Sequence, residues 1–149
     1  MTQIHQVQPS DKLFRWLHPS QFDWAEMRPT SAAFKDSYMS VDLACLTTLE
    51  ESYERGKLIN RNAVASITAG QAFEKAQKVH HCPTQVCEVA GDLVCVTDEG
   101  CRVYRADGLS RKLTCTNPAH GCVVGDKPKS VARFFAKNAE VEIYPPQPT

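Results

Sequence analysis

The feature that most constrains this chain is a run of cysteines and histidines in its later half. Six of the seven cysteines and three of the five histidines lie between Val79 and Gly125. Turn residues such as Ala90-Gly91-Asp92 and Asp107-Gly108 divide this stretch into runs of strand length, as in β-hairpins. We therefore predict a cysteine-rich antiparallel β-meander, with strands at residues 86–89, 93–97, 101–106 and 111–115.

The cysteines and histidines at the two ends of this meander have the chemistry of a zinc site. Zinc takes four sulfur or nitrogen ligands in a tetrahedron, and ligand pairs held across a tight turn suit it well. The spacing is not that of a zinc ribbon. No glutamate or aspartate sits in a recognisable base position beside a ligand, and the zinc-deaminase pattern is absent, so we expect a structural site rather than a catalytic one. The predicted ligands are Cys82, Cys87, Cys115, His120 and Cys122.

Two other interpretations of the cysteines remain open. Cys95 and Cys101 flank the turn at residues 97–100, where they can lie opposite each other as a disulfide or as a further ligand pair. Buried cysteines also serve as small apolar side chains. The N-terminus has neither the basic start nor the apolar run of a secretory signal, so we expect a cytoplasmic protein in which most thiols are reduced.

A single α+β domain is the predicted fold class. The chain has 149 residues with ordinary hydrophobic and charged fractions, so it can bury a core without covalent cross-links. We expect a mixed sheet and about three helices, with the cysteine-rich β-structure at residues 79–125 as an insertion. The domain is assigned to residues 12–144, between a flexible N-terminus at 1–11 and a disordered tail at 145–149.

Local sequence signals place the main elements. Met39, Val41, Leu43 and Cys45 alternate with other residues, which predicts a strand with one buried face and makes Cys45 a core residue rather than a ligand. We also predict a strand at 63–68, a short strand or turn ending at residue 18 and an edge strand near the C-terminus. Helices are expected from residues 49 to 55, from Thr68 and from Ser130, the first with a capping box and a stop at Gly56.

Charge is unevenly distributed although the net charge is zero. Residues 102–137 hold eight basic residues against two acidic ones, which predicts a basic face for a nucleic acid or an acidic protein partner. An ordinary solvated surface is the alternative interpretation. The basic residues are Arg102, Arg105, Arg111, Lys112, Lys127, Lys129, Arg133 and Lys137.

A second candidate site lies near the N-terminus. His18 lies near Arg15 and Arg28, a combination that suits a phosphate or nucleotide pocket with the histidine as acid/base and the guanidiniums as anion holders. Asp42, on the next predicted strand, would orient the histidine. Alternatively, His18 acts as a structural cap before Pro19, and the arginines pair with nearby carboxylates.

Several short motifs resemble those of a small, uncharacterised bacterial protein family with no established activity. They are HPSQF (18–22), RPTSAAFKD (28–36), MSVD (39–42), ITAG (67–70), NPAH (117–120) and a closing KSVARFFAK (129–137). In that family the segment between ITAG and NPAH is shorter and poor in cysteine. The resemblance therefore favours His18, Arg28, Ser31 and His120 as the residues that matter across the family.

Three hypotheses of function follow. The first is a non-enzymatic interaction or regulatory module, with a metal-stapled cysteine-rich subdomain and a basic face. The second is a small enzyme acting on a nucleotide or phosphorylated substrate, with NAD used in the manner of ADP-ribosyltransferases as one version. The third is a subunit whose function depends on a partner. Candidate catalytic residues of the second are Arg15, His18, Arg28, Ser31 and His120.

Overall fold

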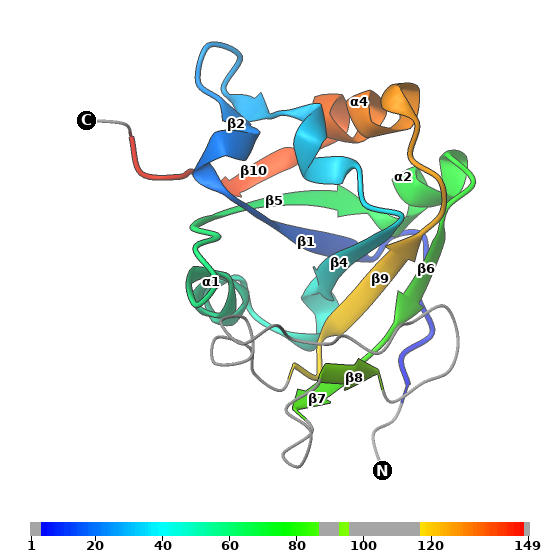
Figure 1. The fold of residues 1–149 in the computed structure, drawn as a ribbon. Coiled ribbons are helices and arrows are strands. Elements are labelled where there is room, and N and C mark those ends of the chain that lie inside the picture. The colour runs from blue at the N-terminus through cyan, green and yellow to red at the C-terminus, as the bar shows by residue number, and fades with distance from the viewer. Residues whose placement is uncertain (1–3, 87–92, 96–116, 148–149) are drawn as a thin grey trace.

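A six-stranded sheet forms the centre of the protein (Figure 1). The computed structural model describes residues 4–86, 93–95 and 117–147, and at 84–86 and 93–95 it describes the backbone alone. The strand order is β10-β5-β1-β4-β9-β6. The strands of this sheet are β1 (Lys12–Leu17), β4 (Tyr38–Leu43), β5 (Ala63–Thr68), β6 (Lys78–His81), β9 (His120–Val124) and β10 (Glu140–Ile143).

Two short strand pairs and several helices complete the described part. The pairs are β2 (Phe22–Asp23) with β3 (Arg28–Pro29), and β7 (Thr84–Val86) with β8 (Leu93–Cys95). The α-helices are α1 (Leu49–Lys57), α2 (Ala69–Glu74) and α4 (Lys129–Asn138), and the 3-10 helices are η1 (Pro19–Gln21), η2 (Ser31–Phe34) and η3 (Ala44–Leu46). None of the helices in the described ranges is long and apolar enough to cross a membrane.

The predicted α+β class is confirmed, and the described residues contain three α-helices. One detail of the sheet differs from our expectation of mixed pairing, because every pairing between the strands described above is antiparallel. Each strand of the large sheet therefore runs opposite to its neighbours. β10 and β6 form the two edges, as predicted for β10.

The sheet has an apolar face and a more polar face, because side chains alternate along each strand. α4, α2 and η2 pack on the apolar face, whereas α1 lies on the other side of the sheet (Figure 1). Trp16 of β1 donates from Nε1 to Ser52 Oγ of α1 at 2.8 Å, which anchors that helix to the polar face. The main buried residues of the apolar face are Leu13, Leu17, Met39, Val41, Leu43, Ile67, Val79 and Val123.

Local signals predicted the helix starts well, and one predicted helix end is wrong. Thr48 and Thr68 each cap a helix with a complete capping box. α1 continues through Gly56, which we expected to end it. A Cβ at Gly56 would lie 2.8 Å from the Arg61 carbonyl oxygen and 3.0 Å from Trp16 Cγ, so a residue without a side chain is needed here for packing rather than for stopping the helix.

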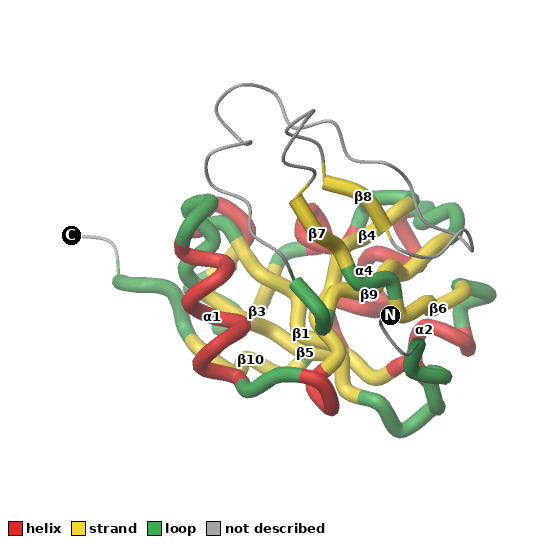
Figure 2. Tube along the Cα trace, turned by 90° about the horizontal axis from the view of Figure 1, so that it is seen from below, coloured by secondary structure: helices red, strands yellow, loops and turns green. Residues whose placement is uncertain are grey.

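Part of the predicted cysteine-rich meander lies within the described residues. β7 and β8 pair antiparallel beside the end of the large sheet (Figure 2), which agrees with a hairpin in this region, although the first strand begins at Thr84. The expected strands at 101–106 and 111–115 lie outside the described residues. The N-terminal segment, expected to be flexible, makes hydrogen bonds from residue 5 onward: the carbonyls of Pro9 and Asp11 accept from Gly70 and Ala69.

Candidate metal centre

Three of the predicted zinc ligands come together on the polar face of the sheet. In the pairing of β6 with β9, His80 lies opposite Cys122, and the Cys82 amide just beyond β6 donates to the His120 carbonyl at 2.8 Å. Strand alternation places His120 and Cys122 on the same face. The ligand atoms of Cys82, His120 and Cys122 lie within 4.8 Å of one another and all three residues are buried, so this group can hold a metal ion.

The His120 ring is oriented by a hydrogen bond across the two strands. Its Nδ1 lies 2.8 Å from the Cys82 carbonyl oxygen, which can only accept, so Nδ1 carries the proton. Burial lowers the pKa of His120, and the Cys82 hydrogen bond and the Asp42 charge oppose this without overcoming it. Nε2 is therefore the nitrogen of this ring that can ligate an ion, and a hydrogen bond from the other nitrogen to a carbonyl is common in metal-bound histidines.

The two sulfurs of this centre differ in chemical state. Cys82 is disulfide-bonded, whereas Cys122 is a buried cysteine that is not part of a disulfide. A disulfide, which the sequence left open for Cys95 and Cys101, is therefore found at Cys82 in this structure. A metal takes a thiolate and not a disulfide sulfur, so the metal-binding form is one in which Cys82 is reduced. The other predicted ligands, Cys87 and Cys115, lie outside the described residues.

Between the two ligands of β9 is a residue that must be small. A Cβ at Gly121 would lie 2.9 Å from the His80 carbonyl oxygen, with Leu43 and Val41 at 3.5 Å on the core side. Any side chain at this position would push β9 away from β6. The glycine thus allows the close strand approach that brings Cys82 to His120.

A buried hydrogen-bond network borders the centre. Asp42 of β4 lies opposite His120 in the sheet, and its carboxylate accepts from Ser52 Oγ at 2.7 Å, Arg55 Nη2 at 2.8 Å and Asn117 Nδ2 at 2.7 Å. Asn117 Oδ1 in turn accepts from the Ala119 amide at 3.1 Å. Asp42 therefore connects α1 with the start of β9, and our expectation that it orients His18 is wrong.

The two N-terminal candidates for catalysis have structural partners. The Arg15 guanidinium donates to the Ala33 and Ser40 carbonyls at 2.9 Å and to the Asp36 carboxylate at 3.2 Å. His18 is the N-cap of η1, and its Nδ1 accepts from the Ser20 amide at 3.1 Å. Both arrangements match the alternative interpretation, in which these residues hold the backbone in place.

Of the remaining catalytic candidates, Arg28 and Ser31 lie on the same side of the molecule as His18, whereas His120 lies apart from them. Arg28 and Ser31 lie near η1, because the Thr30 amide between them donates to the Gln21 carbonyl at 2.8 Å. His120 lies two strands away from β1, in register with Phe14 through Asp42. From strand spacing and rise, His18 and His120 are on the order of 15 Å apart, which is too far for them to act on one bond.

Four residues of the predicted basic face are described, and one of them is buried. Lys127 is 8% exposed and donates from Nζ to the Val123 carbonyl at 2.9 Å and the Gly125 carbonyl at 3.2 Å. Burial, followed by the nearby Arg15 cation, lowers the pKa of Lys127 to about 8. Its place in an exposed basic face is therefore a wrong prediction. Arg102, Arg105, Arg111 and Lys112 lie outside the described residues.

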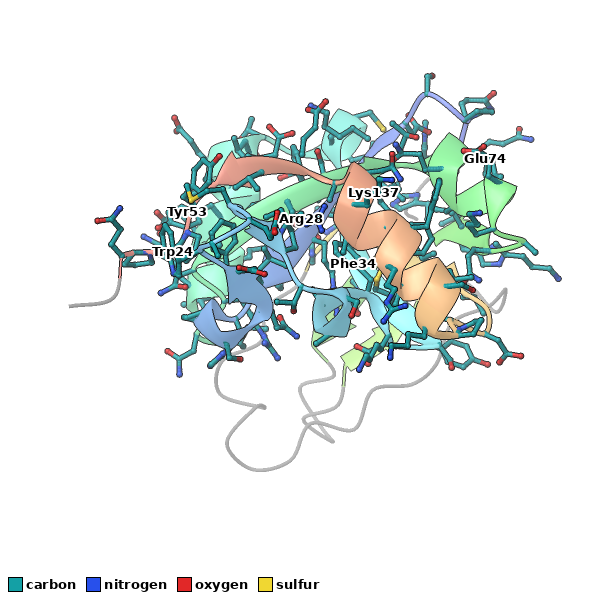
Figure 3. All side chains as sticks on the ribbon, turned by 90° about the horizontal axis from the view of Figure 1, so that it is seen from above. Trp24, Arg28, Phe34, Tyr53, Glu74 and Lys137 are labelled. Carbon is teal, nitrogen blue, oxygen red and sulfur yellow. The ribbon has the colours of Figure 1, made fainter. Side chains whose placement is uncertain are left out.

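The other three described residues of the predicted basic face lie in a regular row on α4. Lys129, Arg133 and Lys137 are all exposed and follow one another at intervals of four residues, so they share one side of the helix. The opposite side of the helix packs Phe135 and Ala132 into the core. Figure 3 shows Lys137 on α4, on the outside of the molecule.

Sequence reasoning missed a second group of ligand-type residues. The ligand atoms of His5, Asp11 and Cys45 also lie within 4.8 Å of one another. We expected Cys45 to be a core residue, but β4 ends at Leu43 and η3 carries Cys45 to the surface. The capping box at Thr48 was the available signal, because a helix start at residue 49 leaves residues 44–47 for a connection rather than a strand.

Comparisons with known proteins add no further residues to these sites. No protein-family model matches the chain, and neither the curated proteins nor the solved structures contain a match to it.

Proposed function

We propose that the chain is a non-enzymatic interaction module in which a zinc ion on Cys82, His120 and Cys122 staples the cysteine-rich segment to the sheet. The observation that carries this proposal is the convergence of three buried ligand atoms within 4.8 Å. Two sulfurs and one imidazole nitrogen are a donor set that zinc prefers over magnesium or calcium.

The position of the centre supports a structural role. Cys82 immediately precedes residues 83–119, and His120 and Cys122 immediately follow them. An ion at this point would bind both ends of the segment, and its binding free energy would offset the entropy cost of holding them together. Full burial of the three side chains also fits a structural ion, because a catalytic zinc keeps a position open to water or substrate.

Zinc titration of the reduced protein tests this centre. We expect one tight binding step, detected by competition with a chromophoric chelator, and a zinc-dependent rise in the free energy of unfolding of about 2.7 kcal/mol at one hundred times Kd. Cobalt in place of zinc should give the intense thiolate charge-transfer absorption of a sulfur-ligated ion. Protein kept oxidised, with Cys82 in its disulfide, should lack the tight step.

Single-residue variants separate this centre from other thiols. Cys122→Ala and His120→Ala should lose the tight step, whereas the matched change Cys45→Ala, at an exposed cysteine outside the centre, should keep it. Tight zinc binding that survives in the double variant Cys45→Ala with Cys122→Ala, which also removes the ligand-type group at His5, Asp11 and Cys45, would show that the proposed centre does not hold the ion.

For the partner of this module we propose a polyanion that binds along Lys129, Arg133 and Lys137. Their common side of α4 is exposed, and the packing of the opposite side into the core fixes the row in place. Three cations in one row match the repeating charge of a nucleic acid backbone, where each phosphate contact releases counterions.

Salt-dependent binding to mixed-sequence DNA tests the partner. If each cation neutralises one phosphate, replacing all three by alanine should make the slope of log K against log salt shallower by about 2.7. A control with three exposed lysines elsewhere, Lys35, Lys57 and Lys78, changed to alanine should retain the slope. Equal slopes for the two triple variants would contradict a role for the row.

A further inference from the structure

A second group of ligand-type side chains lies at the surface, where the N-terminal segment meets the connection after β4. His5 Nε2 lies 2.8 Å from Asp11 Oδ2 and 3.5 Å from Cys45 Sγ. One nitrogen, one carboxylate oxygen and one sulfur thus converge on a single point, although their residues are up to 40 positions apart in sequence.

The geometry distinguishes a metal site from a nucleophilic triad. In a Cys-His-Asp triad the cysteine and the carboxylate contact opposite nitrogens of the imidazole, so that one ring relays a proton between them. Here both contact Nε2 of His5. Three donor atoms around a shared centre are instead the arrangement that a cation requires.

The three donors are held by the surrounding backbone. The Asp11 carboxylate also accepts from the Gln8 amide at 2.7 Å, within a turn closed by the Asp11 amide and the Gln8 carbonyl at 2.9 Å. The His5 amide donates to His81 Nδ1 at 2.7 Å, and the other nitrogen of that ring contacts the Pro118 carbonyl at 2.8 Å. The carbonyl can only accept, so His81 is protonated on Nε2 and its Nδ1 is a proper acceptor for His5.

We propose that His5, Asp11 and Cys45 form a surface binding site for a divalent transition metal ion of the zinc class. A mixed set of sulfur, nitrogen and oxygen suits such an ion better than magnesium or calcium, which take oxygen ligands. The His5 side chain is 28% exposed and Asp11 is 13% exposed, so water has access to the remaining coordination positions. The ion therefore exchanges with solvent, unlike an ion at the buried centre.

Binding at this site ties the N-terminal segment to the body of the domain. Residues 4–7 run beside β6 (Figure 1). They border a groove of about 350 Å³ that is also lined by Val79, His80 and His81 of β6. Cys45 belongs to η3, beyond the end of β4. An ion shared by His5, Asp11 and Cys45 joins these two parts, so metal occupancy controls how firmly the segment covers β6.

Protection of the Cys45 thiol from alkylation tests this site, because Cys45 is exposed whereas Cys122 is buried. Iodoacetamide labelling of Cys45 in the reduced full-length chain is followed by mass spectrometry, with and without zinc. We expect the labelling rate to fall about tenfold at ten times Kd. His5→Ala and Asp11→Ala should remove the protection, and His18→Ala, a histidine outside the group, should keep it.

Zinc protection of Cys45 is expected to be independent of the buried centre at Cys82, His120 and Cys122. Cys122→Ala, which removes that centre, should leave zinc protection of Cys45 unchanged. A labelling rate that zinc does not alter in the natural chain would overturn the proposal, and so would protection that persists in both His5→Ala and Asp11→Ala.

Discussion

Asp42→Ala is expected to lower the free energy of unfolding by about 3–5 kcal/mol, the usual cost of removing one partner from a buried ion pair. The Asp42 side chain is 1% exposed and Arg55 is 16% exposed. The substitution leaves the Arg55 cation without its counterion and removes the acceptor for Ser52 and Asn117. Chemical denaturation at constant pH and salt measures the change.

Two variants make this expectation specific. Asp36→Ala removes the other described ion pair of an arginine with aspartate, but Asp36 is 68% exposed, so a loss of at most about 1 kcal/mol is expected. The double change Asp42→Ala with Arg55→Leu removes both charges and should recover part of the loss, because the uncompensated cation is gone. A cost for Asp42→Ala no larger than that of Asp36→Ala would contradict a buried pair.

The hydrogen-bond network of Asp42 also illustrates why local sequence patterns predict only part of the fold. The starts of α1 and α2 were predictable because the Thr48 and Thr68 capping boxes are complete within four residues. The strand predicted at residues 63–68 is β5. Asp42 meets Asn117 across 75 positions, and no local pattern signals such a contact.

The role of β1 was harder to predict because both of its faces are covered. Leu13 and Leu17 lie in the apolar core, while Phe14 is buried on the other face and Trp16 contacts α1. A strand buried on two sides reads as a nearly continuous apolar run, without the alternation that marks a half-exposed strand. The sequence therefore indicated only a short strand or turn here. It did not indicate that β1 lies in the interior of the sheet, between β4 and β5.

The candidate sites, like the fold, depend partly on local sequence patterns and partly on contacts between residues that are distant in sequence. His120 and Cys122 were predictable partners because alternation places residues two apart on one face. Their meeting with Cys82 was expected from chemistry alone and depends on the β6–β9 register. The His5, Asp11 and Cys45 group depends on the path of the N-terminal segment, which leaves no pattern in the sequence, and on the turn after Leu43, which only the capping box at Thr48 signals.

Phe34→Ala is expected to lower the free energy of unfolding by about 3–5 kcal/mol, as for other fully buried aromatic residues. Phe34, which is labelled in Figure 3, is 0% exposed. The centroid of its ring lies 6.1 Å from that of Phe135 in α4. It is the last residue of η2, a four-residue 3-10 helix without a side-chain cap, so burial of this ring rather than local hydrogen bonding keeps the turn in place.

Loss of this ring should also disturb the sheet, because the Ala33 carbonyl beside Phe34 accepts from the Arg15 guanidinium of β1. Phe73→Ala is the matched control, since it deletes the same side chain where it is 39% exposed, and we expect it to cost a minor fraction of the Phe34 value. Urea denaturation of both variants decides the matter. Similar costs for the two would mean that η2 and α4 are not held together by this contact, and that the loop from residue 30 to 36 owes its position to Arg15 instead.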